Sequence, residues 1–140
     1  MARTAAAMIH LDTSALVDAF TSPYRSGEAL LAIAVLGERL AISTIVLYEW
    51  RRGPRTAEEL GEQEAIVPGA MAMPFDHDAA VMAAALYREV RHSRTRALDL
   101  AIAACAIRHQ ASLWTLNPED FADIPGLVIY KPPTSRRSRH

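Results

Sequence analysis

Three acidic residues lie in stretches of the sequence that are otherwise apolar. Asp12 follows a short apolar run, Glu49 shares a predicted helix face with apolar neighbours, and Asp99 begins a second apolar helical stretch. Carboxylates are rarely buried unless a hydrogen bond, an opposite charge or a metal ion compensates for their lost hydration. These three positions are therefore the first candidates for chemistry.

A divalent cation would explain three carboxylates in one place. Two like charges about 4 Å apart repel by roughly 4 kcal/mol at an effective dielectric of about 20, so protons or a cation must neutralise them. Hard oxygen ligands, without cysteine or suitably spaced histidine, favour Mg²⁺ or Mn²⁺ over zinc. Such an ion activates water and neutralises a phosphoryl oxygen, which predicts phosphodiester hydrolysis.

Each acid also has a purely structural explanation. Asp12 can cap the helix that follows it, and Asp99 can cap its own helix or interact with the helix dipole. Glu49 can pair with Arg51 or Arg52 on the same helix. The functional interpretation therefore depends on whether the three acids meet at one end of a sheet.

The hydrophobic pattern predicts strands that alternate with helices. We expect strands at residues 8–11, 40–42, 70–73, 112–115 and 127–130, and helices after Asp12 and at residues 27–38, 44–52, 56–65, 76–91 and 98–109. This alternation predicts an α/β fold, a three-layer α/β/α domain with a central, mostly parallel sheet of four to five strands. Ligands bind beyond the carboxyl ends of such strands, where Asp12 is placed.

The composition predicts one globular domain at residues 1–130, with its core at 8–130, because 51% of the 140 residues are apolar. Residues 131–140 form a basic segment, expected as a disordered solvated tail or, alternatively, a phosphate-binding one.

The single cysteine, Cys105, fits a reducing cytoplasm and a buried packing role. No run approaches the ~18 apolar residues of a membrane span, so we expect no membrane association.

Four segments carry motifs in a specific order: LDTSALVD at 11–18, STIVLYEWRRGP at 43–54, ALDLAIAACAIRH at 97–109 and LWTLNPEDFADIPGLVIY at 113–130. Together they resemble the PIN-domain ribonucleases of the bacterial VapC toxin kind, over about residues 8–130. The resemblance implies a PIN-like fold and a Mg²⁺-dependent endoribonuclease in which Mn²⁺ can substitute. It also implies that Asp12, Glu49 and Asp99 are the metal-binding and catalytic acids.

The same resemblance implies partners. A VapC-type toxin is neutralised by a cognate VapB-type antitoxin, whose extended tail enters the acidic site, and it is usually a homodimer. Its substrate is RNA, and it contacts operator DNA only through the antitoxin. Each of these properties is an expectation for this chain, as is a cytoplasmic location.

One position departs from the family pattern. Many relatives have an acid just after the fourth strand, where this chain has Asn117, with Asp120 three residues later. Asn117 offers a carbonyl oxygen that could orient a metal-bound water, and Asp120 could supply the missing charge and complete the catalytic set. Asp120 could equally be a turn or cap residue, so the number of metal ions stays open.

Candidate substrate-binding residues flank the acids. The Ser14 hydroxyl could contact a phosphate or cap the first helix. Arginine suits bidentate phosphate contact, although solvated helix ends and partner contacts are equally good explanations for any single one. The arginines next to the acidic motifs are Arg51, Arg52, Arg55, Arg88, Arg91, Arg94 and Arg96, of which Arg51, Arg52 and Arg96 are the main candidates.

Two other functions remain possible. A PIN module that lost turnover through the Asn117 change could serve only in an antitoxin complex on operator DNA. A metal-dependent DNA nuclease, such as a flap nuclease, would share the acids but has little room here for elements that grip a duplex junction. The chain contains no GxxxxGK[ST], GxSxG or GxGxxG motif, which argues against nucleotide-binding and serine-hydrolase classes.

Overall fold

A computed structural model describes residues 8–21 and 26–132 of the chain. Four strands form one sheet in the order β2-β1-β3-β4, and every pair of neighbours is parallel. Ile9, at the centre, pairs with Leu40 on one side and with Ser112 on the other. The parallel sheet is confirmed; its strands are β1 (Met8–Leu11), β2 (Arg39–Ala41), β3 (Ser112–Trp114) and β4 (Val128–Ile129).

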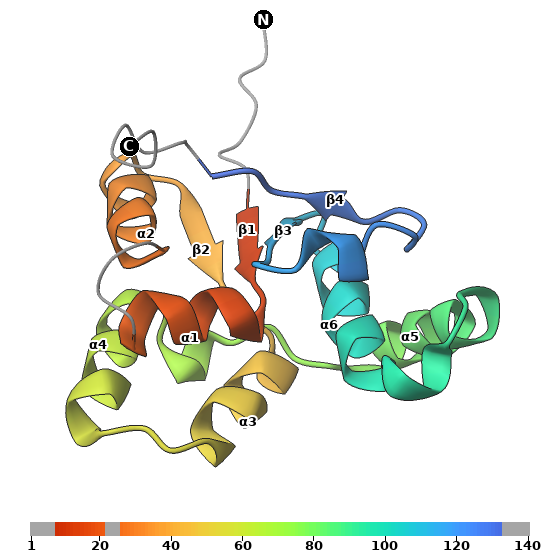
Figure 1. Cartoon of the computed structure of the whole chain (residues 1–140), viewed down its shortest axis with the longest axis horizontal. Helices are drawn as coiled ribbons and strands as arrows, with labels where there is room; N and C mark the ends of the chain where they lie inside the picture. Colours follow the sequence, from red (N-terminus) through yellow and green to blue (C-terminus); the bar gives the residue numbers. More distant parts are fainter. Residues whose placement is uncertain (1–7, 22–25, 133–140) are drawn as a thin grey trace, which may run out of the picture.

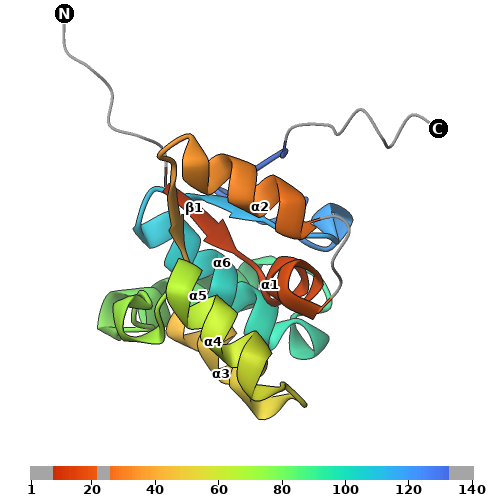
Figure 2. The ribbon, with the colours of Figure 1, turned by 90° about the vertical axis from the view of Figure 1, so that its left-hand side faces the viewer.

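Six α-helices surround the sheet and confirm the three-layer prediction. In Figure 1 helices α2 and α4 lie to the left of the strands and α5 and α6 to the right, while α1 and α3 lie below the end of β1. Figure 2 shows the molecule from that left-hand side, with α1, α2 and α4 towards the viewer. The helices are α1 (Thr13–Thr21), α2 (Ser26–Val35), α3 (Thr44–Arg52), α4 (Ala57–Ile66), α5 (His77–Glu89) and α6 (Ala97–Arg108).

Side-chain caps fix where three helices begin. Ser43 accepts a hydrogen bond of 3.1 Å from the backbone N–H of Val46 at the start of α3, and Asp76 caps α5 in the same way. Thr56 and Glu59 form a reciprocal capping box at the start of α4. A cap of this kind contributes about 1 kcal/mol, so the first turn of α3, which leads to Glu49, is held by its own sequence.

The strand expected at residues 70–73 was wrong. The chain instead forms the 3₁₀ turn η1 (Gly69–Met71), closed by hydrogen bonds from the N–H of Met71 to the carbonyl of Pro68 and from Ala72 to Gly69. These local bonds coil the backbone, so only Met73 reaches the sheet, through one parallel bridge to Ser43. The sheet accordingly has four strands, and β2 is an edge strand.

The core lies between the sheet and the helices. Trp50 and Trp114 are its largest fully buried side chains, and α6 contributes seven consecutive buried residues that include Cys105. The indole N–H of Trp50 donates to the side-chain carbonyl of buried Gln63, at 3.1 Å, which fastens α3 to α4. The buried packing role expected for Cys105 is confirmed. Truncation of such a tryptophan to alanine costs about 3–5 kcal/mol.

No helix in residues 8–21 and 26–132 is both long and apolar enough to cross a membrane. The expectations for residues 1–7 and for the end of the basic tail at 133–140 concern parts of the chain that lie outside the described residues.

Candidate active site

Asp12 is held at the carboxyl end of β1 by backbone and side chains. Its N–H donates to the carbonyl of Trp114 at 2.8 Å, and its side chain is buried, with the residue only 5% exposed. Oxygen Oδ2 accepts hydrogen bonds of 2.8 Å from both the Ser14 and the Thr115 hydroxyls. Within the described chain no hydrogen bond engages the other oxygen, Oδ1, which leaves it free to take a ligand.

The two hydroxyls are themselves oriented by backbone. The oxygen of Ser14 accepts from the N–H of Leu116 at 3.0 Å, and that of Thr115 accepts from the N–H of Asn117 at 3.1 Å. Since each hydroxyl oxygen already accepts a backbone bond, its proton is available to Asp12. Sequence reasoning missed Thr115 altogether, although its place directly after β3, at the sheet edge that carries Asp12, could have indicated it.

Glu49 lies on α3 and connects this helix to α1. Its Oε1 accepts a hydrogen bond of 2.5 Å from the Thr13 hydroxyl, while Oε2 lies 3.6 Å from the guanidinium of Arg52. The Glu49 side chain is 17% exposed, and that of Arg52 is 51% exposed. The structural alternative, a pair with Arg52, is therefore present, but it is a long contact at the surface and contributes little to stability.

Asp99 brings the three acids together. It lies in the first turn of α6 and is half-buried. Burial, together with the negative charges of Asp12, Glu49 and Asp120, raises the pKa of its carboxyl to about 6, while Arg96 opposes the shift. Each of the other three acids therefore lies near enough to Asp99 to act on it electrostatically.

Asn117 and Asp120 lie on the exposed segment after β3. Asp120 ends the 3₁₀ turn η3 (Pro118–Asp120), close enough for its charge to act on Asp99. Asn117 precedes this turn, and its side-chain amide makes no hydrogen bond within the part of the chain described here. The structure therefore associates the charge of Asp120 with the acidic site and gives the Asn117 side chain no specific contact there.

Arg96, expected to bind substrate, uses its guanidinium within the protein. It donates to both carboxylate oxygens of Asp123, at 3.0 and 2.6 Å, and to the carbonyls of Arg91 and Asp120, each at 2.9 Å. Its side chain is only 16% exposed. These bonds join the segment that carries Asp120 to the start of α6, so the geometry indicates a structural clamp at the edge of the site.

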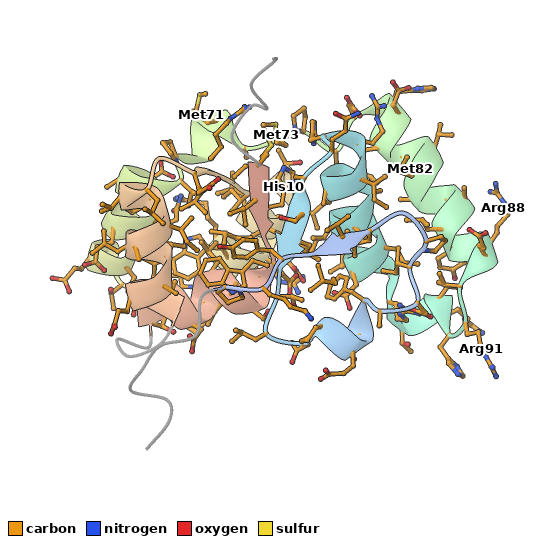
Figure 3. The ribbon with its side chains drawn as sticks, turned by 90° about the horizontal axis from the view of Figure 1, so that it is seen from above. His10, Met71, Met73, Met82, Arg88 and Arg91 are labelled. Carbon is orange, nitrogen blue, oxygen red and sulfur yellow. The ribbon has the colours of Figure 1, made fainter. Side chains whose placement is uncertain are left out.

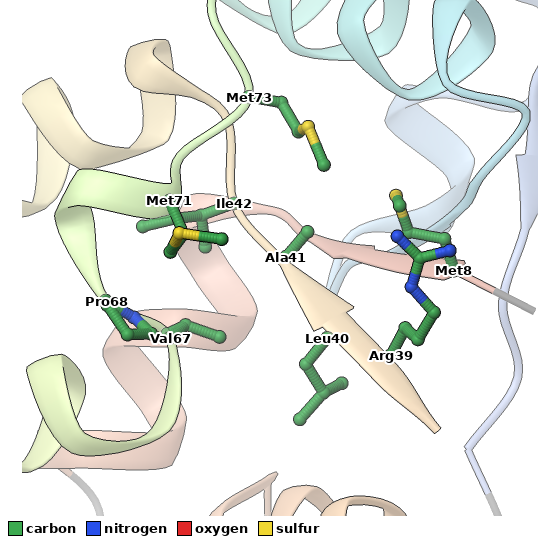
Figure 4. Close-up of a pocket in the computed structure, with 9 residues that line it drawn as sticks. All are labelled: Met8, Arg39, Leu40, Ala41, Ile42, Val67, Pro68, Met71 and Met73. Atoms are coloured by element: carbon green, nitrogen blue, oxygen red, sulfur yellow. The ribbon is translucent and has the colours of Figure 1, made fainter. Parts of the chain in front are cut away.

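The other two candidate arginines lie at the end of α3. Arg51 is exposed, and Arg52 faces both Glu49 and the ring of Tyr48, whose centroid is 5.0 Å away. The pocket drawn in Figure 4 lies elsewhere, at the outer edge of β2, and is lined by none of the predicted site residues. The candidate site is therefore the acidic cluster at the carboxyl ends of β1 and β3.

The donor set fits a hard divalent cation, with a restriction. Its members are carboxylates, whose mutual repulsion a cation relieves, and Oδ1 of Asp12 is free. Residues 8–21 and 26–132 contain no group of three or more histidine, cysteine or acidic side chains close enough to ligate one ion together. Mg²⁺ usually keeps several waters and takes one or two carboxylates, which suits this arrangement.

Comparison with protein families identifies the fold. A family model described as "PIN domain" matches residues 9–127, which is most of the chain. The chain belongs to the PIN domain family. This match spans all four acids of the site, Asp12, Glu49, Asp99 and Asp120. PIN domains are generally nucleases that use a divalent metal, which agrees with the donor set. Among curated proteins no match is found.

Solved structures similar to this PIN domain come from toxin-antitoxin systems. VapBC-5 from Mycobacterium tuberculosis, a member of the VapBC family, shares 30% identity over 89% of this chain and 99% of its own, with a TM-score of 0.59. A toxin-antitoxin complex from Klebsiella pneumoniae shares 29% identity over 88% and 98%, with a TM-score of 0.66. VapBC2 from Rickettsia felis, bound to promoter DNA, has the same fold (24% identity over 90% and 99%, TM-score 0.70). This PIN domain is thus homologous to the VapC toxins of VapBC systems.

Proposed function

We propose that this PIN domain is a metal-dependent endoribonuclease that acts as the toxin of a VapBC-type pair. The observation that supports this most is the position of Asp99, which lies within electrostatic reach of Asp12, Glu49 and Asp120 at the carboxyl edge of the sheet. Such a cluster is stable in its ionised form only with a cation, and Mg²⁺, or Mn²⁺ in its place, is the ion that carboxylates of this kind select.

The side chains have distinct roles in this proposal. Asp12 and Asp99 would hold the metal, with Oδ1 of Asp12 as a ligand, because Ser14 and Thr115 occupy Oδ2. The bound ion supplies charge neutralisation at the phosphate and lowers the pKa of water. Glu49 accepts the proton of the attacking water at Oε2, since Oε1 already accepts from Thr13. Asp120 adds negative charge beside Asp99, and Asn117 orients water there.

Partners form a second part of the proposal. The VapBC homologues support a cognate VapB-type antitoxin, and the DNA-bound complexes among them support contact with operator DNA through that antitoxin. A homodimer and a cytoplasmic location complete the proposal. Light scattering of the purified chain, alone and with the product of a neighbouring antitoxin gene, tests the oligomeric state and the antitoxin together.

A cleavage assay tests the activity directly. Labelled structured RNA and DNA of the same sequence are offered with Mg²⁺ or Mn²⁺, with and without EDTA, to the wild type and to Asp12→Asn. Asp78→Asn is the matched control, because Asp78 is an exposed acid that pairs with Arg108 on α6. We expect EDTA-sensitive RNA cleavage by the wild type and the control, and none by Asp12→Asn.

The other outcomes are equally informative. Full activity of Asp12→Asn at saturating Mg²⁺ would exclude the proposed mechanism. Intact RNA together with tight antitoxin binding would favour a silent module that lost turnover at Asn117. Preferential cleavage of DNA would favour a DNA nuclease.

A further inference from the structure

The arginines of the described chain fall into two groups. In the first, the charge is compensated within the protein: Arg52 lies near Glu49, Arg96 pairs with Asp123, and Arg108 pairs with Asp78. Arg55 also has a partner, because its guanidinium lies 4.3 Å from the ring centroid of Trp50. The arginines of the second group make no ion pair with any acid of the described residues. Three members of this group lie close together in the sequence: Arg88, Arg91 and Arg94.

These three residues, which we call the arginine patch, are exposed basic side chains of one short segment of the chain. Arg88 lies in the last turn of α5, Arg94 lies in the 3₁₀ turn η2 (Ser93–Thr95), and all three side chains are exposed. They recur at every third position, and Glu89 is the only acid between residues 88 and 96. Figure 3 shows Arg88 and Arg91 at one end of α5, both directed away from the body of the protein.

The arginine patch adjoins the acidic site through Arg96. The Nη1 of Arg96 donates to the carbonyl of Arg91, and its Nη2 donates to the carbonyl of Asp120, each at 2.9 Å. One side chain therefore connects the backbone of the patch to the segment that carries a site acid. Asp120 in turn acts electrostatically on Asp99, so the patch lies on the side of the acidic site that carries η3.

We propose that the arginine patch binds the phosphate backbone of the RNA substrate beside the cleaved bond. This inference rests on the proposed ribonuclease function. The acidic site repels RNA, and residues 1–130 hold 11 basic and 16 acidic residues, a net charge of −5, so RNA affinity within this part of the chain must come from locally uncompensated cations. Guanidinium groups bind phosphate oxygens in a bidentate fashion and are always charged, which suits backbone contact without sequence preference.

Salt dependence of RNA binding tests this proposal. The variant R88Q/R91Q/R94Q is compared with R39Q/R108Q/K131Q, which removes the same charge from β2, the end of α6 and the residue after Tyr130. Binding of an end-labelled stem–loop RNA is measured by fluorescence anisotropy over a range of KCl concentrations, with Mg²⁺ present. Both variants carry Asp12→Asn in this measurement, so that the RNA stays intact.

The patch variant should bind roughly tenfold more weakly at low salt than the control variant. Its slope of log K against log salt should be smaller by about 2, because each phosphate contact on a single strand contributes about 0.7. In the background that keeps Asp12, KM for RNA cleavage should rise by a similar factor while kcat stays within about twofold. Since the substituted side chains are exposed, thermal unfolding should be unchanged.

An equal slope and equal affinity for the two variants would overturn the patch proposal. If the wild type still cleaves RNA in an EDTA-sensitive way, only the patch inference fails; if the wild type neither binds nor cleaves RNA, the proposed function fails as well. Loss of antitoxin binding by the patch variant, with RNA binding intact, would likewise overturn the assignment and indicate a protein-binding surface.

Discussion

The Thr115 hydroxyl donates a hydrogen bond of 2.8 Å to Oδ2 of Asp12, a residue 103 positions earlier in the chain. This contact joins the ends of β1 and β3 across the sheet, and Ser14 makes a second bond to the same oxygen. Together the two hydroxyls fix the rotation of the carboxylate and leave Oδ1 without a hydrogen bond among the described residues.

Thr115→Val should reduce catalysis because it removes one of these donors while it preserves the shape of the side chain. We expect kcat to fall roughly tenfold and the free energy of unfolding to fall by about 1–2 kcal/mol, the usual cost of a lost buried hydrogen bond. Thr115→Ser retains the hydroxyl and should keep most of the activity. Wild-type activity in Thr115→Val would show that Asp12 needs no such support.

Arg96 and Asp123 should behave as one unit if Arg96 is a clamp. Arg96→Lys breaks the bidentate contact with Asp123, and Asp123→Asn removes the negative charge of the Asp123 carboxylate. Each variant should lower kcat, by up to about 100-fold if Asp120 shifts by about an ångström. The double variant should be no worse than the more affected single variant. A rise in KM for Arg96→Lys alone, with Asp123→Asn unaffected, would instead support the original prediction that Arg96 binds substrate.

Asp99→Asn should stabilise the metal-free protein while it abolishes cleavage. The pKa of Asp99 is raised to about 6 in the folded state. Folding therefore favours the protonated form, and stability falls as the pH rises from about 4 through 6. Because the residue is only half-buried and solvent screens its charge, we expect a gain of about 1 kcal/mol at pH near 7.5, measured by urea unfolding in EDTA.

Unfolding of the wild type and of Asp99→Asn in the presence of Mg²⁺ is the complementary measurement. Mg²⁺ should raise the unfolding midpoint of the wild type and have a smaller effect on Asp99→Asn, because a ligand stabilises the state that binds it. A less stable Asp99→Asn protein in EDTA would contradict the proposed repulsion.

His10 should make the fold sensitive to acid. It is 1% exposed, its ring lies 5.4 Å from that of His109, and neither ring nitrogen has a hydrogen-bond partner among the described residues. Burial, assisted by the charge of His109, lowers its pKa to about 4. As the pH falls, His10 therefore takes up a proton in the unfolded state before it does so in the folded state. The free energy of unfolding decreases as the pH falls below about 6.5 towards 4.

The variant His10→Leu isolates this contribution. Between pH 7 and pH 5 the wild type should lose about 2 kcal/mol more than His10→Leu, measured by urea unfolding at both pH values. His109→Leu provides a control, since it removes the neighbouring charge and leaves the buried ring. Parallel pH profiles for the wild type and His10→Leu would show that the ring stays neutral in both states.

The sequence alone was sufficient to predict the fold class and to indicate three acids as candidate site residues. Alternating strands and helices predict a parallel sheet, and an acid directly after a strand or on an apolar helix face is visible without a structure, because burial of a charge is costly. The caps Ser43 and Asp76 are local signals of the same kind, since each is satisfied within three residues of its own position. Such local preferences were sufficient to predict four strands and six helices from the sequence.

Tertiary structure decided what local preference cannot encode. The segment at 70–73 has the composition of a strand, yet bonds within η1 compete with pairing to β2, and only Met73 joins the sheet. Thr115 and Ser14 became partners of Asp12 because β1 and β3 are neighbours, and Arg96 became a clamp because η3 folds back onto α6. Charge and hydroxyl groups are properties of single residues, but their partners depend on distances between segments that only the packed sheet and helices fix.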